Sequence, residues 1–433
     1  MLGEDKAEDR LRELLRDPRW SLPERPDPQP RIRRAAQRQR LRLTGVAAAV
    51  AVIAVAVPVG IGASGRVSGP AAHHRATAPV IYAAYNNKSL AAVIPVDTAT
   101  NKAGKPVRAG LGLQVAITPD GKTAYVLNGG AFTVTPVSTA TNTVGRPIHL
   151  PRSSFEPSFI AITPDGKTAY VACQHAVVPI STATNTAGKP IPVGFSPTAI
   201  AITPDGKTAY VVGTPNNGFG LRGTVTPIDT ATDKAGKPIR VGPGAFQIAI
   251  TPDGKTAYAY GGSAVTPIRT ATNTAGTPIS LHGNFDGGDI AITPDGKTLY
   301  VRTINPDTVV PISTATNTAS APIKVHLSAG GLPDMPAVTA IQFVITPDGK
   351  TLYLATGGDS VVAISTATNT ATTIRFRSGC RVQPRTGIAI TPDSKTAYVT
   401  CQNEIIPIST ATNTPGKPIP IPLKDPDAIA ITP

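Results

Sequence analysis

The chain has 433 residues, of which only 5% are aromatic, with 40 Gly, 44 Pro and a formal net charge of +14. Three cysteines and no C-x-x-C pair exclude a disulfide-stapled fold and predict no metal site. No basic patch is interleaved with aromatic residues, so the sequence predicts no nucleic-acid partner, whereas a basic charge attracts anionic polymers or lipid headgroups.

Residues 1–42 are predicted to form a basic, partly disordered cytoplasmic tail. Asp5 to Asp17 can form a short helix, and the Pro residues between 23 and 30 then favour an extended tether. The helix is interpreted either as a frayed end or as a docking element for a cytoplasmic partner.

Residues 43–63 are predicted to cross a membrane once. Leu43 to Ile61 contains 19 positions without a charge, enough for a helix to span the hydrocarbon core. Six arginines between Arg31 and Arg42 precede it, which places the N-terminus in the cytoplasm and the rest of the chain outside the cell. A cleaved signal peptide is the alternative, but it has a shorter apolar region and a small-x-small cleavage site.

Residues 64–79 are predicted to be a linker, and residues 80–433 repeat. A TPDGK segment followed by a TATNT segment recurs at spacings typical of β-propeller blades. Its anchor threonines are Thr118, Thr163, Thr203, Thr251, Thr293, Thr346 and Thr391, with a truncated copy at Thr432.

Each repeat predicts four antiparallel strands. An apolar strand ends in a Pro-Asp-Gly turn, and the second strand contains TAYV or TLYV. A third strand such as VVPIS then leads through TATNT into a fourth such as KPIPV. A repeated sheet of this kind is a propeller blade, so the fold class is all-β.

Counting the strand types separately predicts eight blades, with seven as the alternative. The repeat region begins with a second strand at Val80 to Ala84 and ends with a first strand at Ala428 to Thr432. One blade would therefore combine three strands from the start with one from the end, which closes the ring and removes two exposed sheet edges.

The repeats resemble the YVTN family of β-propeller repeats. The matching tetrapeptides are YVLN at 125–128, YVAC at 170–173, YVVG at 210–213, YVRT at 300–303 and YVTC at 398–401. The resemblance covers about residues 80–433 and implies a propeller of the kind found in surface-layer, secreted or anchored prokaryotic proteins. The third-strand Asp common in that family is mostly Ser here.

Two rims are expected, and ligand binding is predicted on only one of them. TPDGK and TATNT form a uniform rim, whereas the other rim carries loops that differ between repeats and are the natural place for recognition. The predicted ligand-binding residues on this variable rim are Phe155, Glu156, Phe219, Arg222, His282, Asp286, His326, Asp334 and Arg385. Ordinary loop variation without a ligand is the alternative.

The cysteines suggest one disulfide. Cys380 and Cys401 both map to the variable rim, so a bond between them outside the membrane is a candidate. Cys173 is expected to be a buried thiol.

The sequence favours a binding protein over an enzyme. No H-E-x-x-H or G-x-S-x-G motif occurs, and no catalytic residue or cofactor is predicted. Among the residues that begin the first strands, only Asp289 is acidic, whereas a propeller hydrolase needs several such groups around its axis. We therefore expect a membrane-anchored, extracellular binding scaffold whose partner is a cell-wall polymer, glycan or protein, with a lactonase-like or glycan-cleaving hydrolase as the alternative.

Overall fold

The structure is a computed structural model. It describes residues 78–85, 92–110, 112–152, 157–194, 196–213, 222–281, 289–303, 307–325, 343–355, 359–376, 387–422 and 426–433.

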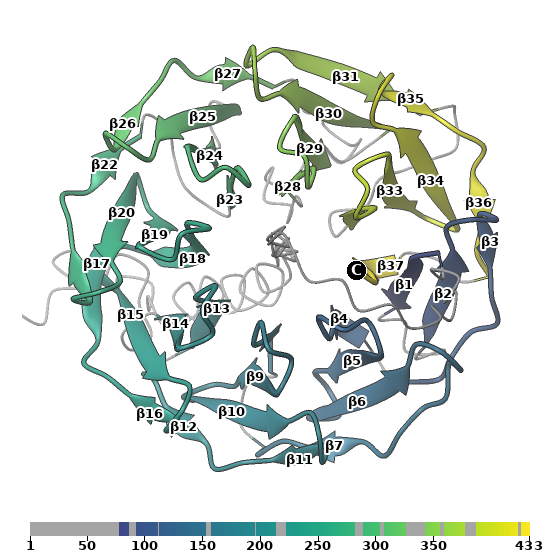
Figure 1. Ribbon diagram of the computed structural model, residues 1–433, viewed down its shortest axis with the longest axis horizontal. Helices are drawn as coiled ribbons and strands as arrows, with labels where there is room; N and C mark the ends of the chain where they lie inside the picture. Colours follow the sequence, from purple (N-terminus) through teal and green to yellow (C-terminus); the bar gives the residue numbers. More distant parts are fainter. Residues whose placement is uncertain are drawn as a thin grey trace, which may run out of the picture. The chain divides into compact units, whose positions relative to one another are not determined.

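The strands of this region form eight antiparallel sheets arranged in a ring, which confirms the predicted eight blades (Figure 1). Blade 1 consists of β1 (Val80–Tyr85), β2 (Val93–Asp97), β3 (Lys102–Ala103) and β37 (Pro426–Ile431). Blade 2 consists of β4 (Gly112–Ile117), β5 (Thr123–Asn128), β6 (Thr133–Ser138) and β7 (Ile148–His149). Blade 3 consists of β8 (Phe159–Ile162), β9 (Thr168–Ala172), β10 (Ala176–Ser181), β11 (Thr186–Ala187) and β12 (Ile191–Pro192).

The next three blades repeat this order. Blade 4 consists of β13 (Pro197–Ile202), β14 (Thr208–Gly213), β15 (Arg222–Asp229), β16 (Lys234–Ala235) and β17 (Ile239–Pro243). Blade 5 consists of β18 (Ala245–Ile250), β19 (Thr256–Gly261), β20 (Ala264–Arg269), β21 (Thr274–Ala275) and β22 (Ile279–Ser280). Blade 6 consists of β23 (Ile290–Ile292), β24 (Thr298–Thr303), β25 (Thr308–Ser313), β26 (Thr318–Ala319) and β27 (Ile323–Lys324).

Two blades complete the ring. Blade 7 consists of β28 (Phe343–Ile345), β29 (Thr351–Ala355), β30 (Ser360–Ser365) and β31 (Ala371–Arg375). Blade 8 consists of β32 (Ile388–Ile390), β33 (Thr396–Cys401), β34 (Glu404–Ser409), β35 (Thr414–Pro415) and β36 (Ile419–Pro420).

Blade 1 closes the ring, as the repeat count predicts. β37 pairs antiparallel with β1, so that Ile81 lies opposite Ile431 and Ala83 opposite Ile429. Val80 N also donates to Thr432 Oγ1 at 2.8 Å. Both strands thereby gain a partner, and neither is left as an open sheet edge.

The outermost strand differs from the continuous fourth strand that the sequence suggests, because in most blades it is two short segments. In blade 3, β11 and β12 pair with opposite ends of β10. Pro190 lies between the two segments and has no N–H to donate to β10. Gly188 lies so close to the Pro179 ring of β10 that an added Cβ would be 3.1 Å from it, so a residue with a side chain would be crowded there. Blade 7 has neither this proline–glycine contact nor a proline within its outer strand. Ala363 and Thr372 pair there instead, and β31 is continuous.

The hydrophobic core lies between neighbouring blades. One layer joins Tyr170 and Val177 of blade 3 to Ala209, Val211 and Ile228 of blade 4. Similar layers join the other blades, so each blade depends on its neighbours to bury both of its faces.

Within the residues described by the structure, no helix is long and apolar enough to cross a membrane. The predicted tail, the predicted span at residues 43–63 and most of the predicted linker lie outside them.

Candidate functional site

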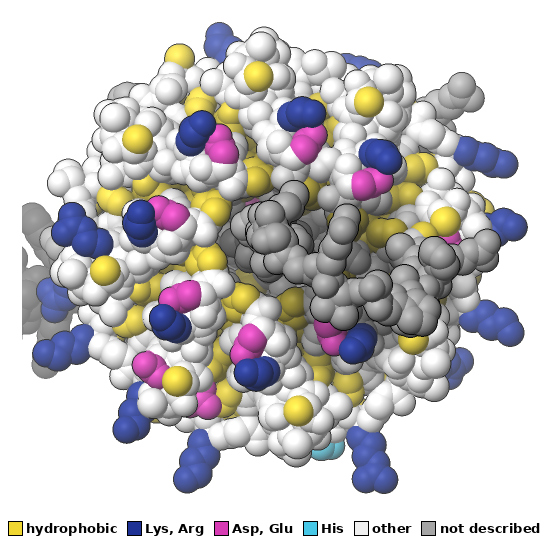
Figure 2. Space-filling model, in the orientation of Figure 1, with side chains coloured by type: hydrophobic (Ala, Val, Ile, Leu, Met, Phe, Trp, Pro, Cys, Tyr) yellow, Lys and Arg dark blue, Asp and Glu magenta, His cyan; other side chains and the backbone are white. Residues whose placement is uncertain are grey.

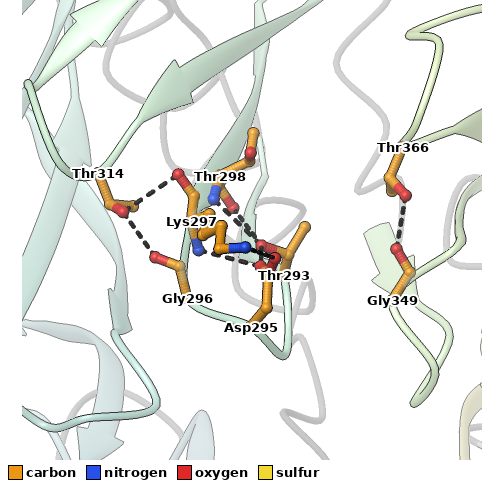
Figure 3. Close-up of polar contacts among 8 residues, drawn as sticks. All are labelled: Thr293, Asp295, Gly296, Lys297, Thr298, Thr314, Gly349 and Thr366. Carbon is orange, nitrogen blue, oxygen red and sulfur yellow. Dashed lines mark hydrogen bonds and ion pairs between the residues drawn. The ribbon is translucent and has the colours of Figure 1, made fainter.

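The TPDGK turns form a uniform rim whose polar groups bond to one another, as blade 6 illustrates (Figure 3). Thr293 Oγ1 donates to Asp295 Oδ1 at 2.6 Å, and Lys297 N donates to the same oxygen at 3.0 Å. The Thr293 hydroxyl is the main cause that lowers the pKa of the Asp295 carboxyl. Gly296 has a φ of 71°, which a residue with a side chain adopts only under strain. The recurrence of this motif along the chain is thus explained by turn chemistry.

The same rim exposes seven Asp–Lys ion pairs around the ring (Figure 2). Their N–O distances are 3.4–3.7 Å, and the lysine side chains are 81–82% exposed. Exposed pairs of this kind contribute little to stability, and each carboxylate already has a cation beside it.

A small cleft of about 270 Å³ lies on this rim between blades 6 and 7. Its polar lining includes Asp295, Asp348 and Thr366. Asp348 accepts from Thr346 Oγ1, and Thr366 Oγ1 donates to the Gly349 carbonyl at 2.6 Å. The polar groups of the cleft therefore serve the turns, and nothing here singles out a ligand.

The second-strand tyrosines and the TATNT turns form a closed circle of hydrogen bonds between blades. Each tyrosine hydroxyl donates to a side-chain oxygen of the following blade at 2.6–2.8 Å. The pairs are Tyr82–Asn142, Tyr125–Asn185, Tyr170–Asp233, Tyr210–Asn273, Tyr258–Asn317, Tyr300–Asn369, Tyr353–Asn413 and Tyr398–Asn101. All eight acceptor residues have φ between 52° and 55°, the left-handed region that Asn and Asp tolerate well.

Of the ligand-binding residues predicted for the variable rim, the structure describes Arg222. Arg222 begins β15, where its backbone pairs with Pro243 of β17. The others lie outside the described residues: Phe155, Glu156, Phe219, His282, Asp286, His326, Asp334 and Arg385. The prediction that these residues share one ligand-binding site therefore stays a prediction.

Asp289 lies fully buried at the start of the first strand of blade 6. Its Oδ1 accepts from Ile290 N at 2.9 Å, and its Oδ2 accepts from Phe343 N of blade 7 at 3.1 Å. Gln114 makes the equivalent hydrogen bond between blades 2 and 3, since its Oε1 accepts from Ile160 N at 2.8 Å. Burial raises the pKa of Asp289 to about 7, while the two N–H donors and the Arg302 charge oppose that rise.

Arg302 lies beside Asp289 and was missed as a site residue, because the sequence places it at the edge of a variable loop. The Arg302 N–H donates to the Asp289 carbonyl, so the two residues are cross-strand neighbours. The side chain is 0% exposed. The signal that would have found it is its register: Arg302 follows Tyr300 by two positions, where other blades have residues such as Leu127, Val212 or Thr400.

Arg302 is incompletely paired. Nη2 lies 3.3 Å from Asp307 Oδ1, whereas Nε and Nη1 are buried and have no acceptor among the described residues. The Tyr260 hydroxyl donates to the Arg302 carbonyl at 2.9 Å. A buried guanidinium with two open donors is costly for the folded state, which makes it the strongest departure from the repeat in the described chain.

The cysteines differ in state. Cys401 is disulfide-bonded, whereas Cys173 is a free thiol, and burial raises its pKa to about 11. Cys380 lies outside the described residues, so its pairing with Cys401 stays a prediction.

The outer wall of the ring is strongly basic. We define it as residues 101–108, 142–150, 185–193, 233–241, 273–281, 317–325, 369–376 and 413–421, which contain the last strand segments of the blades. It carries eleven Lys and Arg residues, all exposed, and one acid, Asp233. Six of the cations lie in two blades: Lys102, Lys105 and Arg108 in blade 1, and Lys234, Lys237 and Arg240 in blade 4.

Among the described residues, no group of three or more His, Cys, Asp or Glu side chains lies close enough to hold a metal ion.

A ring of eight sheets that closes through a shared blade defines an eight-bladed β-propeller. No family model matches the chain, and no curated protein matches it. Dihydro-heme d1 dehydrogenase NirN, solved in complex with DHE, has a TM-score of 0.62 and 14% identity over 81% of this chain and 74% of its own. Hydrazine synthase of Kuenenia stuttgartiensis has a TM-score of 0.52 and 21% identity over 72% of this chain and 95% of its own.

A functionally unknown protein from Desulfotomaculum acetoxidans DSM 771 is also similar, with a TM-score of 0.54 and 18% identity over 72% of this chain and 99% of its own. At such low identities these similarities establish the fold and leave activity open.

Proposed function

We propose that the chain is a membrane-anchored, extracellular propeller of the YVTN type that acts as a binding scaffold, and that its outer wall docks onto an anionic polymer at the bacterial cell surface. The observation that supports this most directly is the outer wall, where eleven exposed cations face one acid. Such an excess of one sign attracts a polymer of the opposite sign and accelerates its association.

The uniform rim is a weaker candidate for the same partner. Its lysines lie 3.4–3.7 Å from carboxylates, whereas among the described residues no cation of the outer wall forms an ion pair, although Asp97 and Asp229 are the cross-strand partners of Lys102 and Lys234. The proposed anchor at residues 43–63, with arginines before it, would hold this basic wall close to the polymers and lipids of the outer surface.

The first test measures binding of the full chain, purified in detergent, to poly(glycerol phosphate) and to a neutral glucan. We expect binding to the phosphate polymer alone, weakening as salt is raised because screening shortens the range of the attraction. Reversing the blade 4 cluster with Lys234→Glu, Lys237→Glu and Arg240→Glu should weaken binding at least tenfold, since three contacts worth roughly 1 kcal/mol each are lost, and salt screens part of that energy.

The matched control reverses three exposed lysines of the uniform rim, Lys167→Glu, Lys207→Glu and Lys255→Glu, with the same change in net charge. The control should retain most of the binding. If both variants lose affinity equally, net charge rather than the outer wall is responsible, and no binding at low salt would reject the proposal.

A propeller hydrolase is the second candidate, because a buried carboxyl with a pKa of about 7 is in the range of a general acid or base. Both oxygens of Asp289 already accept backbone N–H groups, which is why we prefer binding to catalysis. Hydrolysis of lactones or glycans that is lost in Asp289→Asn, with the fold intact, would favour the enzyme.

A further inference from the structure

We propose that Arg302 is the centre of an oxyanion-binding site between blades 6 and 7, which takes the carboxylate or phosphate group of a small ligand. The site is separate from the outer wall, so either proposal can fail without the other.

The first argument is the set of open donors. Nη2 of Arg302 is bonded to Asp307, whereas Nε and Nη1 are buried without an acceptor. A guanidinium presents paired N–H groups along two edges, one made by Nε with Nη2 and one by Nη1 with Nη2. Each edge therefore has an open donor, and an oxyanion is the ligand whose geometry matches such an edge.

The second argument is that neighbouring acids do not satisfy these donors. Asp289 is the cross-strand neighbour, but its oxygens accept from Ile290 N and Phe343 N, and it forms no ion pair with Arg302 within the distance of a salt bridge. The Tyr260 hydroxyl donates to the Arg302 carbonyl, and it does not accept from Nε or Nη1 of the guanidinium. Asp307 is 28% exposed and is the single acid that pairs with it among the described residues.

The third argument is that the repeat does not need a charge here. The positions equivalent to Arg302 in blades 1 to 4 are Ala84, Leu127, Ala172 and Val212, all of which are buried and apolar. Arg302 projects from β24 on the same side as Tyr300, which belongs to the same apolar cluster as Leu352 and Ile364 of blade 7. Replacing a buried ionic group by a well-packed apolar one is often neutral or stabilising, so scaffold stability does not account for the arginine.

The balance of donors and acceptors also favours such a ligand. Asp307 offsets the charge of the guanidinium, so what the site lacks is an acceptor for Nε and Nη1. An oxyanion on the open edge would supply that acceptor.

Thermal unfolding of the full chain tests the proposal, with formate, phosphate and chloride added at constant ionic strength. A ligand that binds only the folded state raises Tm in a saturable way. We expect formate or phosphate to do so at millimolar concentrations and chloride to have little effect. Formate alone would indicate a carboxylate ligand, and phosphate alone a phosphorylated one.

Arg302→Leu, which installs the residue of blade 2, should fold and lose the oxyanion effect. Arg302→Lys should weaken it at least tenfold, because an ammonium keeps the charge but not the paired edge. The control Arg269→Leu removes one exposed arginine and should leave the effect unchanged.

A crystal soaked with selenate gives a second measurement that does not depend on the variants. Anomalous density within hydrogen-bond distance of Nε or Nη1 is the expected result. No saturable oxyanion effect in the wild type, an equal effect in Arg302→Leu, or water alone beside Arg302 would overturn the proposal.

Discussion

Asp289 and Arg302 show how one position can have different roles in otherwise similar repeats. Gln114 and Asp289 occupy the same place in their blades, and each accepts an N–H from the first strand of the next blade. A neutral amide does this in blade 2, whereas blade 6 uses a buried carboxyl next to a buried guanidinium. The interblade bond alone therefore does not require a charged residue.

At this scale we predict a pH effect from Asp289. Because its pKa is raised in the folded state, the folded protein holds a proton between about pH 4 and 7 that the unfolded chain has released, so this group makes stability fall as pH rises through that range. Asp289→Gln should remove this slope, which cannot exceed about 1.4 kcal/mol per pH unit for one proton.

The measurement is Tm of wild type and Asp289→Gln between about pH 5 and 8, where the carboxyls of the uniform rim, whose pKa values are lowered, stay ionised. The charged and titratable groups that interact with Asp289 in the described region are Arg302 and Tyr260, and Asp307 pairs with Arg302. If the difference in Tm between wild type and Asp289→Gln stays the same across this pH range, Asp289 does not titrate in it.

At the scale of the element, the TATNT turn joins two requirements in one residue. Its Asn must adopt a positive φ, and its side-chain oxygen must meet the tyrosine of the preceding blade. Burial raises the pKa of Tyr210 to about 12, so the hydroxyl remains a donor at any physiological pH. Asp233 fulfils both requirements opposite Tyr170, which shows that the oxygen rather than the amide nitrogen is needed.

For the Tyr210–Asn273 pair we predict that the losses in unfolding free energy caused by the two single substitutions are not additive. Tyr210→Phe and Asn273→Gly each remove the hydrogen bond while keeping an accessible backbone, and each should cost about 1 kcal/mol. The double variant should cost less than the sum, whereas Asn273→Ala should cost more than Asn273→Gly because Ala tolerates the left-handed region poorly. Denaturant unfolding of the four proteins checks this, and additive losses would mean that the bond does not couple the blades.

At the scale of the whole molecule, stability depends on closure. Each apolar layer is shared by two blades, and the layer around Ile81, Ile429 and Ala389 joins both ends of the propeller region to blade 8. Opening the ring would expose such a layer together with two strand edges, the features that promote association between chains.

We therefore predict that a proline destabilises the propeller when it is placed in the innermost strand of a blade, and has little effect in the outermost strand. Ala430→Pro removes an N–H from β37, which pairs with Tyr82 across the closing ladder, and should lower Tm and cause oligomerisation. Ala187→Pro lies in the outermost segment β11, where blade 8 already has Pro415, and should have little effect. Light scattering and thermal unfolding distinguish the two, and a monomeric, stable Ala430→Pro variant would contradict the importance of closure.

Much of the fold could be predicted because the same local signals for turns and strands occur in repeat after repeat. The Pro-Asp-Gly turn, the apolar strand before it and the tyrosine strand after it recur so often that strand order and blade number follow from counting. The split outer strand was not predicted, because it depends on contact between Pro179 and Gly188 across two strands. For the candidate site, the sequence singled out Asp289, but not Arg302 as its cross-strand neighbour.

The sequence by itself determined the architecture, including the blade shared by the two ends of the repeat, because turns and strand alternation act over a few residues and are visible in a linear pattern. Only the tertiary structure decided what Tyr, Asn, Asp289 and Arg302 do. Their partners lie in adjacent blades, 40 or more residues away in several cases, so that their hydrogen bonds, burial and charge exist only once the ring has closed.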